Sequence, residues 1–138
     1  MTPTPHTIGL GQSLTVARRI MQEHGIRHLP VLDGGTLIGL LSERDVFLVE
    51  SLPATNPADV RAEEAMVADV LTTSADAPLA EVVQEMVDRK AGSAIVVQGK
   101  QVIGVLTTID ALGALLDLLT STDEEEDVDS AGPAPAVV

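Results

Sequence analysis

The sequence predicts an α+β fold built from two tandem β-α-β-β-α repeats that pack on each other. The first observation is an internal duplication: a shift of 65 positions aligns residues 7–47 with residues 72–112 without a gap. Nine aligned pairs are identical, among them Asp45/Asp110, and most other pairs keep their polar or apolar class. A period this long, present in only two copies, indicates a pair of small units rather than a solenoid.

Composition excludes several classes of function. The chain has 138 residues with 45% hydrophobic content, which suits one compact domain with a sizeable core. It has no cysteine, which excludes disulfides and thiol chemistry and fits a reducing cytosol. No apolar run reaches the roughly 18 residues of a membrane span, and the N-terminus lacks signal-peptide features, so we expect a soluble cytoplasmic protein without a membrane partner.

The net charge of −13 argues against a nucleic-acid partner, because such binding depends largely on Lys and Arg that neutralise phosphates. Six of these negative charges lie between Asp123 and Asp129, which leaves about −7 for the rest of the chain.

The first repeat is expected over residues 1–51. Its apolar pattern predicts a short strand, a helix with Ser13 as N-cap and Gly25 at its end, a hairpin with a Gly-Gly turn, and a second helix that begins at Ser42. The expected ranges are 7–8 for the strand, 14–24 for the helix, 29–32 and 37–41 for the hairpin strands and 42–51 for the last helix.

Residues 52–65 are expected to be a linker, since prolines, Asn56 and charged residues interrupt both the helical and the strand spacing of apolar residues there. The second repeat, residues 66–119, replays the first. Its last helix carries an apolar stripe, from which we expect a homodimer, because exposed apolar patches of that size usually meet a partner. The stripe consists of Ile109, Leu112, Leu115, Leu116 and Leu119. Residues 120–138, acidic and then rich in proline and alanine, are expected to be disordered.

Each repeat carries the pattern Gly-x-x-Ser/Thr-x-x-Asp, which ends at Asp45 in the first copy and at Asp110 in the second. One interpretation is a nucleoside phosphate site: glycine lets a ligand approach the backbone, a helix N-terminus favours an anion, and the aspartate accepts from both ribose hydroxyls. The other interpretation is a capping box, in which hydroxyl and carboxylate satisfy unpaired amides of the helix. The pattern leaves both open.

The segments Ile26 to Asp33 and Gly39 to Asp45, repeated as Ala94 to Val97 and Gly104 to Asp110, resemble a tandem pair of CBS (cystathionine β-synthase) domains, a Bateman module. The resemblance covers residues 1–119. It implies that the repeats associate through their sheets with pseudo-twofold symmetry. It also implies two clefts that receive adenosine-containing ligands such as AMP, ATP or S-adenosylmethionine, as regulatory ligands rather than as catalytic cofactors.

The resemblance implies an asymmetric pair of clefts. In the cleft with Thr107 and Asp110, phosphate contacts would come from Arg27, His28 and Arg44, which favours this cleft for a phosphorylated ligand. The alternative is that both arginines are solvated and His28 is an ordinary strand-edge residue.

The second, weaker cleft would hold Ser42 and Asp45 together with Gly92, Ser93 and Ile109, and it lacks a cation. The positions that flank adenine in the family are Thr7, Ile8 and Ile26, with Thr72 as the counterpart in the weaker cleft. Ordinary core packing is the alternative for these four residues.

Two classes of function follow. The first is a stand-alone regulatory module that binds an adenosine-type ligand and signals to an effector protein that the sequence does not identify. The second is a structural dimerisation or scaffold module with degenerate ligand sites, favoured by Gly92 and Ser93 at the positions of Arg27 and His28. An enzyme is not expected, because no nucleophile and base are paired. No metal site is expected either, since the three histidines lack metal-ligand spacing.

Overall fold

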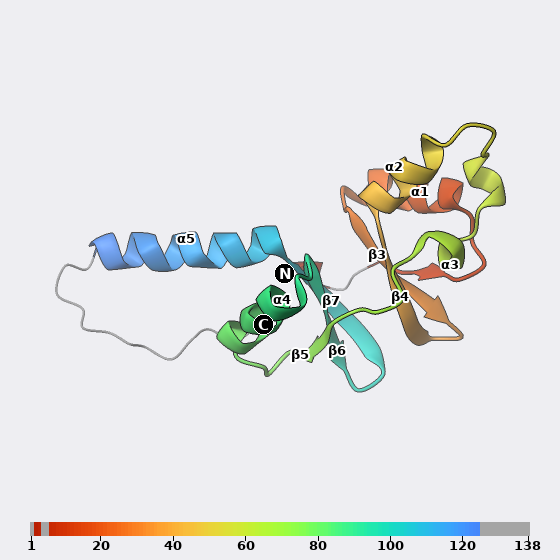
Figure 1. Cartoon of the computed structure of the whole chain (residues 1–138). Coiled ribbons are helices and arrows are strands. Elements are labelled where there is room, and N and C mark those ends of the chain that lie inside the picture. Colours follow the sequence, from red (N-terminus) through yellow and green to blue (C-terminus); the bar gives the residue numbers. More distant parts are fainter. Residues whose placement is uncertain (1, 4–5, 125–138) are drawn as a thin grey trace. The chain divides into compact units, whose positions relative to one another are not determined.

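The computed structural model describes residues 2–3 and 6–124 of the chain. They form two compact units (Figure 1). The first-repeat unit holds residues 6–70 together with residues 98–103. The second-repeat unit holds Thr2 and Pro3, residues 71–97 and residues 104–124.

The first-repeat unit contains the predicted β-α-β-β-α order. Strand β2 pairs in parallel with β3, and β3 pairs antiparallel with β4, in a three-stranded sheet of order β2-β3-β4. The elements are β2 (Ile8–Gly9), α1 (Leu14–His24), β3 (His28–Asp33), β4 (Thr36–Ser42), α2 (Glu43–Glu50), the 3-10 helix η1 (Pro57–Asp59) and α3 (Ala62–Ala65). The α+β class and this element order are confirmed.

The second-repeat unit repeats the order with one extra strand from the start of the chain. Its four-stranded sheet has the order β1-β7-β6-β5. The elements are β1 (Thr2–Pro3), β5 (Thr72–Ser74), α4 (Leu79–Arg89), β6 (Ser93–Gln98), β7 (Gln101–Thr107) and α5 (Thr108–Glu124). The expectation that helix gives way to a disordered tail at residue 120 is wrong for residues 120–124, which continue α5. The rest of the predicted tail, residues 125–138, lies outside the described residues.

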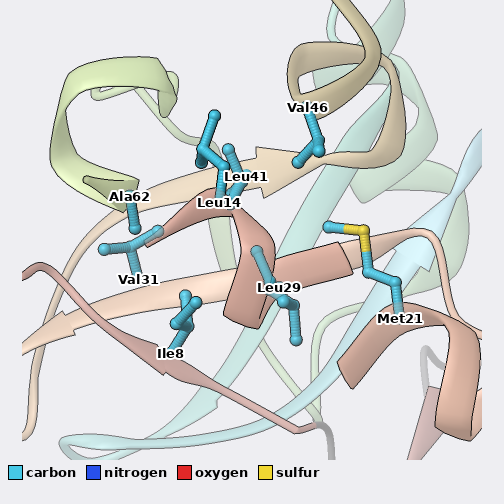
Figure 2. Packing of buried hydrophobic residues seen from close by; sticks show 9 residues of the cluster. Ile8, Leu14, Met21, Leu29, Val31, Leu41, Val46 and Ala62 are labelled. Atoms are coloured by element: carbon cyan, nitrogen blue, oxygen red, sulfur yellow. The ribbon is translucent and has the colours of Figure 1, made fainter. Parts of the chain in front are cut away.

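The core of the first-repeat unit forms where α1, α2 and α3 cover one face of the sheet (Figure 2). Its buried side chains come from positions that the two periodicities predict, two apart on strands and three or four apart on helices. They are Ile8, Leu14, Ala17, Met21, Leu29, Val31, Leu41, Val46 and Ala62.

Ala62, which lies within the expected linker of residues 52–65, belongs to this core. Ala62 is fully buried, its N–H donates to the carbonyl of Gln12 (2.8 Å), and the N–H of Leu14 donates to the carbonyl of Val60 (2.9 Å). The segment therefore packs on the start of α1 in addition to connecting the repeats.

An ion pair joins the two long helices of the first-repeat unit. Arg18 of α1 donates through Nε to Glu50 Oε2 of α2 (3.2 Å) and through Nη2 to Glu50 Oε1. The hydrogen bond to Glu50 raises the pKa of Arg18 above its ordinary value, against a smaller lowering by burial. This two-point contact fixes α2 beside α1.

The opening segment of each repeat pairs with the hairpin of the other repeat. Strand β1 runs antiparallel to β7, with Thr2 opposite Val105. At the equivalent position 65 residues along, Val67 forms a bridge with Leu40 of β4, in which each N–H donates to the other carbonyl at 2.9 Å. Each compact unit therefore contains the opening segment of the other sequence repeat.

Gly39 makes room for this exchange in β4. A Cβ atom at Gly39 would meet Met66 Sδ and would lie 2.9 Å from the carbonyl oxygen of Val67. Met66 and Val67 therefore occupy the space that a side chain at position 39 would need. Gly39 therefore has a packing role in the first repeat, and the ligand-approach role that the sequence suggested for this glycine stays a prediction.

We predict that Gly39→Ala lowers the free energy of unfolding by about 1–3 kcal/mol, because the Val67 carbonyl belongs to a hydrogen-bonded bridge and cannot move away cheaply. Urea denaturation measures the change. Gly113→Ala in α5 is the matched control, since nothing lies within 4 Å of its Cβ position. This control should be neutral or stabilise by roughly 0.5–1 kcal/mol. Equal effects of the two substitutions would contradict the packing role of Gly39.

Candidate functional site

Both copies of the repeated pattern form capping boxes at helix N-termini. At α2, Ser42 N–H donates to Asp45 Oδ2 (2.9 Å) and Asp45 N–H donates to Ser42 Oγ (3.1 Å). At α5, Thr107 N–H donates to Asp110 Oδ2 (2.8 Å), and Asp110 N–H donates to Thr107 Oγ1 (3.3 Å). The hydroxyl of Thr107 also donates to Asp110 Oδ2 (3.1 Å).

The capping interpretation of the pattern is therefore correct for the chain without a ligand. The capping bonds use Oδ2 of each aspartate. A carboxylate has two oxygens and about four acceptor positions, so capping and binding of a hydroxyl are compatible in one side chain. The two interpretations do not exclude each other.

A backbone hydrogen bond holds the start of each hairpin against the start of the following helix. In the first repeat Glu43 N–H donates to the carbonyl of Arg27 (2.8 Å), and in the second Thr108 N–H donates to the carbonyl of Gly92 (3.1 Å). His28 lies opposite Ser42 in the register of β3 and β4. The fold thus brings residues 27–28 and 42–44, which are distant in sequence, to one place.

A hollow of about 420 Å³ forms at that place in the first-repeat unit. Its lining includes two arginines and the carboxylate of Glu43. Helix α2 also contributes Phe47, which is the only Phe, Tyr or Trp of the protein. The lining residues are Arg27, His28, Ser42, Glu43, Arg44, Phe47 and Leu48. The structure therefore gathers three residues predicted to contact phosphate and one residue predicted for the weaker cleft.

Phe47 is the lining residue that the sequence interpretation missed. It follows Arg44 by three residues on α2, which places the two on one helix face. Its side chain is 64% exposed, unusual for a phenylalanine, and it offers a flat apolar surface beside the arginines. The spacing from Arg44 was the signal that could have identified it.

The residues predicted to flank adenine differ in how deeply they are buried. Ile8 is buried in the core, and Ile26 is half-buried and packs against that core. Thr7 is half-buried directly before β2. The core alternative therefore describes both isoleucines, while Thr7 keeps partial access to solvent.

The remaining predicted residues belong to the second-repeat unit. Asp110 and Thr107 are half-buried in their capping box, Ser93 begins β6 and is half-buried, and Thr72 begins β5 and is exposed. Ile109 is exposed on α5. The cleft that combines Asp110 with the arginines of the first repeat stays a prediction.

Other kinds of site find little support in the described part of the chain. Within residues 2–3 and 6–124, no three His, Cys, Asp or Glu side chains gather in a way that could hold a metal ion. The rings of His6 and His24 stack with centroids 3.6 Å apart. Among the same residues, no helix has the length and hydropathy needed to cross a bilayer.

Comparison with known proteins places the chain in a family. The CBS domain model matches residues 1–51 and 62–117, so this chain belongs to the CBS domain family and carries two such domains. The second match begins at Ala62, the residue that enters the core of the first-repeat unit.

Solved CBS structures have the same fold. The Vibrio cholerae protein AcuB superposes with a TM-score of 0.72 at 29% identity, over 90% of this chain and 92% of that one. CBSX2, solved in complex with AMP, gives a TM-score of 0.71 at 21% identity, over 86% and 94% of the two chains. The CBS domain pair of MJ0100, solved with 5′-methylthioadenosine and S-adenosyl-L-methionine, gives 0.71 at 24% identity, over 85% and 93%.

Curated relatives are mostly larger proteins. The inosine-5′-monophosphate dehydrogenase of Korarchaeum cryptofilum is 44% identical over 45 residues, which are 33% of this chain and 10% of that enzyme. This chain spans 12% and 22% of the next two relatives. The similarity therefore concerns the CBS domains and not the activity of the larger proteins.

We predict that Asp45→Ala and Asp110→Ala each lower the free energy of unfolding by about 1 kcal/mol, because each removes the acceptor of a capping box. Urea denaturation tests both. Asp45→Asn and Asp110→Asn are matched controls, since the amide oxygen can still accept the N–H of Ser42 or Thr107. An alanine variant as stable as its asparagine counterpart would show that the box contributes nothing.

Proposed function

We propose that this chain is a regulatory CBS pair module that binds an adenosine-containing ligand of the AMP, ATP or S-adenosylmethionine class and signals its presence to an effector protein. The observation that carries this proposal is the hollow in which Arg27, His28 and Arg44 meet the N-terminus of α2. Arginine forks match phosphate oxygens, and the positive end of a helix favours an anion. The net charge of the chain is −13, so two arginines in one hollow are not expected from composition alone, and anion binding would explain them.

The proposed ribose contact is Asp110, with Thr107 beside it. The Asp110 carboxylate is held in place by the capping bonds to Thr107, so it is preorganised to accept hydroxyl groups. The occurrence of AMP, S-adenosylmethionine and 5′-methylthioadenosine in related folds supports the ligand class. Thr7, Ile8 and Ile26 are proposed for the adenine side, of which Thr7 is the most accessible.

A structural scaffold with degenerate ligand sites is the second candidate. It is favoured by the observation that the two aspartates already serve their helices. At the register positions of Arg27 and His28, the second repeat has Gly92 and Ser93, which carry no charge.

We also propose that the role is regulatory rather than catalytic and that the protein acts in the cytoplasm without a nucleic-acid or membrane partner. The acidic composition and the lack of cysteine support this setting.

We predict that calorimetric titration with AMP detects binding, and that Asp110→Ala weakens it at least about tenfold, because one charge-assisted hydrogen bond contributes about 1.5–3 kcal/mol. Asp45→Ala should weaken binding much less. Because both variants lose a cap, each is measured at a temperature where it is fully folded. Equal effects of the two variants would overturn the assignment of the ribose contact, and absence of binding to AMP, ATP, adenosine and S-adenosylmethionine would support the scaffold.

We predict that Arg27→Ala weakens AMP binding more than adenosine binding, because only AMP carries the phosphate that the guanidinium would contact. The difference should shrink at high salt, which screens exposed charges. Arg19→Ala is the matched control, since Arg19 is exposed on α1 and does not line the hollow. An equal loss for both ligands would place Arg27 away from the phosphate.

We further propose that the chain forms a homodimer, because α5 leaves a row of leucines open to solvent. Leu112, Leu115, Leu116 and Leu119 are each at least half exposed. Multi-angle light scattering should show a dimer at micromolar concentration, and Leu116→Glu should give a monomer. Ala80→Glu, at an exposed position of α4, is the control and should stay dimeric. A monomeric unmodified chain would refute this proposal.

A further inference from the structure

The tips of the two hairpins carry opposite charges although they occupy equivalent positions of the repeat. The first tip reads Asp-Gly-Gly-Thr over residues 33–36, and the second reads Gln-Gly-Lys-Gln over residues 98–101. The second tip therefore has an amide at the position of the carboxylate and a lysine at the position of the second glycine. In a chain with a net charge of −13, one of the few cations thus lies at this tip.

The backbone of the second turn permits the lysine. In the first turn both central residues have a positive φ, 56° at Gly34 and 88° at Gly35, which favours glycine at both positions. In the second turn only the first central residue, Gly99, has a positive φ, of 60°, so the next position accepts an ordinary side chain. Lys100 occupies that position and is exposed.

A second hollow of the first-repeat unit, with a volume of about 630 Å³, includes this tip. Its surface combines apolar side chains with one hydroxyl, two amides and one ammonium group. The lining residues are Thr7, Leu32, Gly35, Gln98, Lys100, Gln101 and Val102. Lys100 is the only charged residue among them. The hollow therefore offers one positive charge and several hydrogen-bond donors, and none of its lining residues is acidic.

The polar side chains of this hollow are available to a ligand. Within residues 2–3 and 6–124, no hydrogen bond or ion pair engages the Thr7 hydroxyl, the two glutamine amides or the Lys100 ammonium. Other cations of the same unit are used differently, since the Arg18 guanidinium pairs with the Glu50 carboxylate. A ligand at the hairpin tip would therefore not have to displace a carboxylate from Lys100.

We propose that this hollow binds a small organic anion, whose phosphate or carboxylate group contacts the Lys100 ammonium and the side-chain amides of Gln98 and Gln101. An ammonium group and amide N–H groups all donate hydrogen bonds, and the oxygens of such an anion accept them. The charge on both sides strengthens the contact with Lys100. Leu32 and Val102 would contact the carbon part of the ligand.

This anion site goes beyond the proposed function and does not depend on an adenosine ligand. It is lined by the tip of the β6–β7 hairpin, whereas Arg27 and Arg44 line the hollow at the start of β3 and α2. Thr7 is the one residue that the anion site shares with the residues proposed for adenosine. The two sites can therefore be followed separately, each through the amide signals of its own residues.

Nuclear magnetic resonance of the full ¹⁵N-labelled chain tests the site, with sodium phosphate and sodium succinate as probes. We expect saturable shifts of the side-chain amide signals of Gln98 and Gln101 with at least one probe, and no such shifts with sodium chloride at equal ionic strength. The more tightly bound probe identifies phosphate or carboxylate chemistry. Absence of saturation with both probes would overturn the proposal. Saturable shifts confined to the amides of Arg27 and Arg44 would also overturn it, while they would support the phosphate contact of the proposed function.

Removal of the lysine charge provides the second measurement. Lys100→Gln should raise the dissociation constant of the bound probe about three- to fivefold, which is the effect of losing one exposed charge contact. The fold should be unaffected, because Lys100 is exposed and its φ is not positive. Arg19→Gln is the matched control, since it removes the same charge at an exposed position of α1 that does not line the hollow. Equal dissociation constants for the two variants would mean that only the overall charge matters, and the proposed site would then be wrong.

Discussion

The backbone hydrogen bond between the entry of each hairpin and the first turn of the next helix is the constraint on which the candidate site depends. Glu43 N–H to the Arg27 carbonyl, and Thr108 N–H to the Gly92 carbonyl, each join two segments 16 residues apart. Because unpaired amides at a helix N-terminus must find acceptors, this bond and the adjacent capping box share that task. Together they fix where any side chain at positions 27, 28 and 44 can stand.

The two repeats share this backbone arrangement but carry different side chains on it. The counterpart of Arg27 in the second repeat is Gly92. The counterparts of the Arg18–Glu50 ion pair are two apolar residues. The first unit therefore presents a charged hollow and tightly joined helices. The second presents an apolar hollow of about 230 Å³ between α4 and α5, lined in part by Val83 and Met86. Duplication preserved backbone geometry, and the side chains diverged.

The sequence alone predicted the elements well because local rules determine them. Ser13 and Gly25 bound α1 as expected: Ser13 accepts the N–H of Val16, and Gly25 adopts a left-handed conformation with φ of 61°. The exchange of opening segments and the burial of Ala62 were not predictable in the same way. Each depends on which distant segment lies alongside, information that hydrophobic periodicity does not contain.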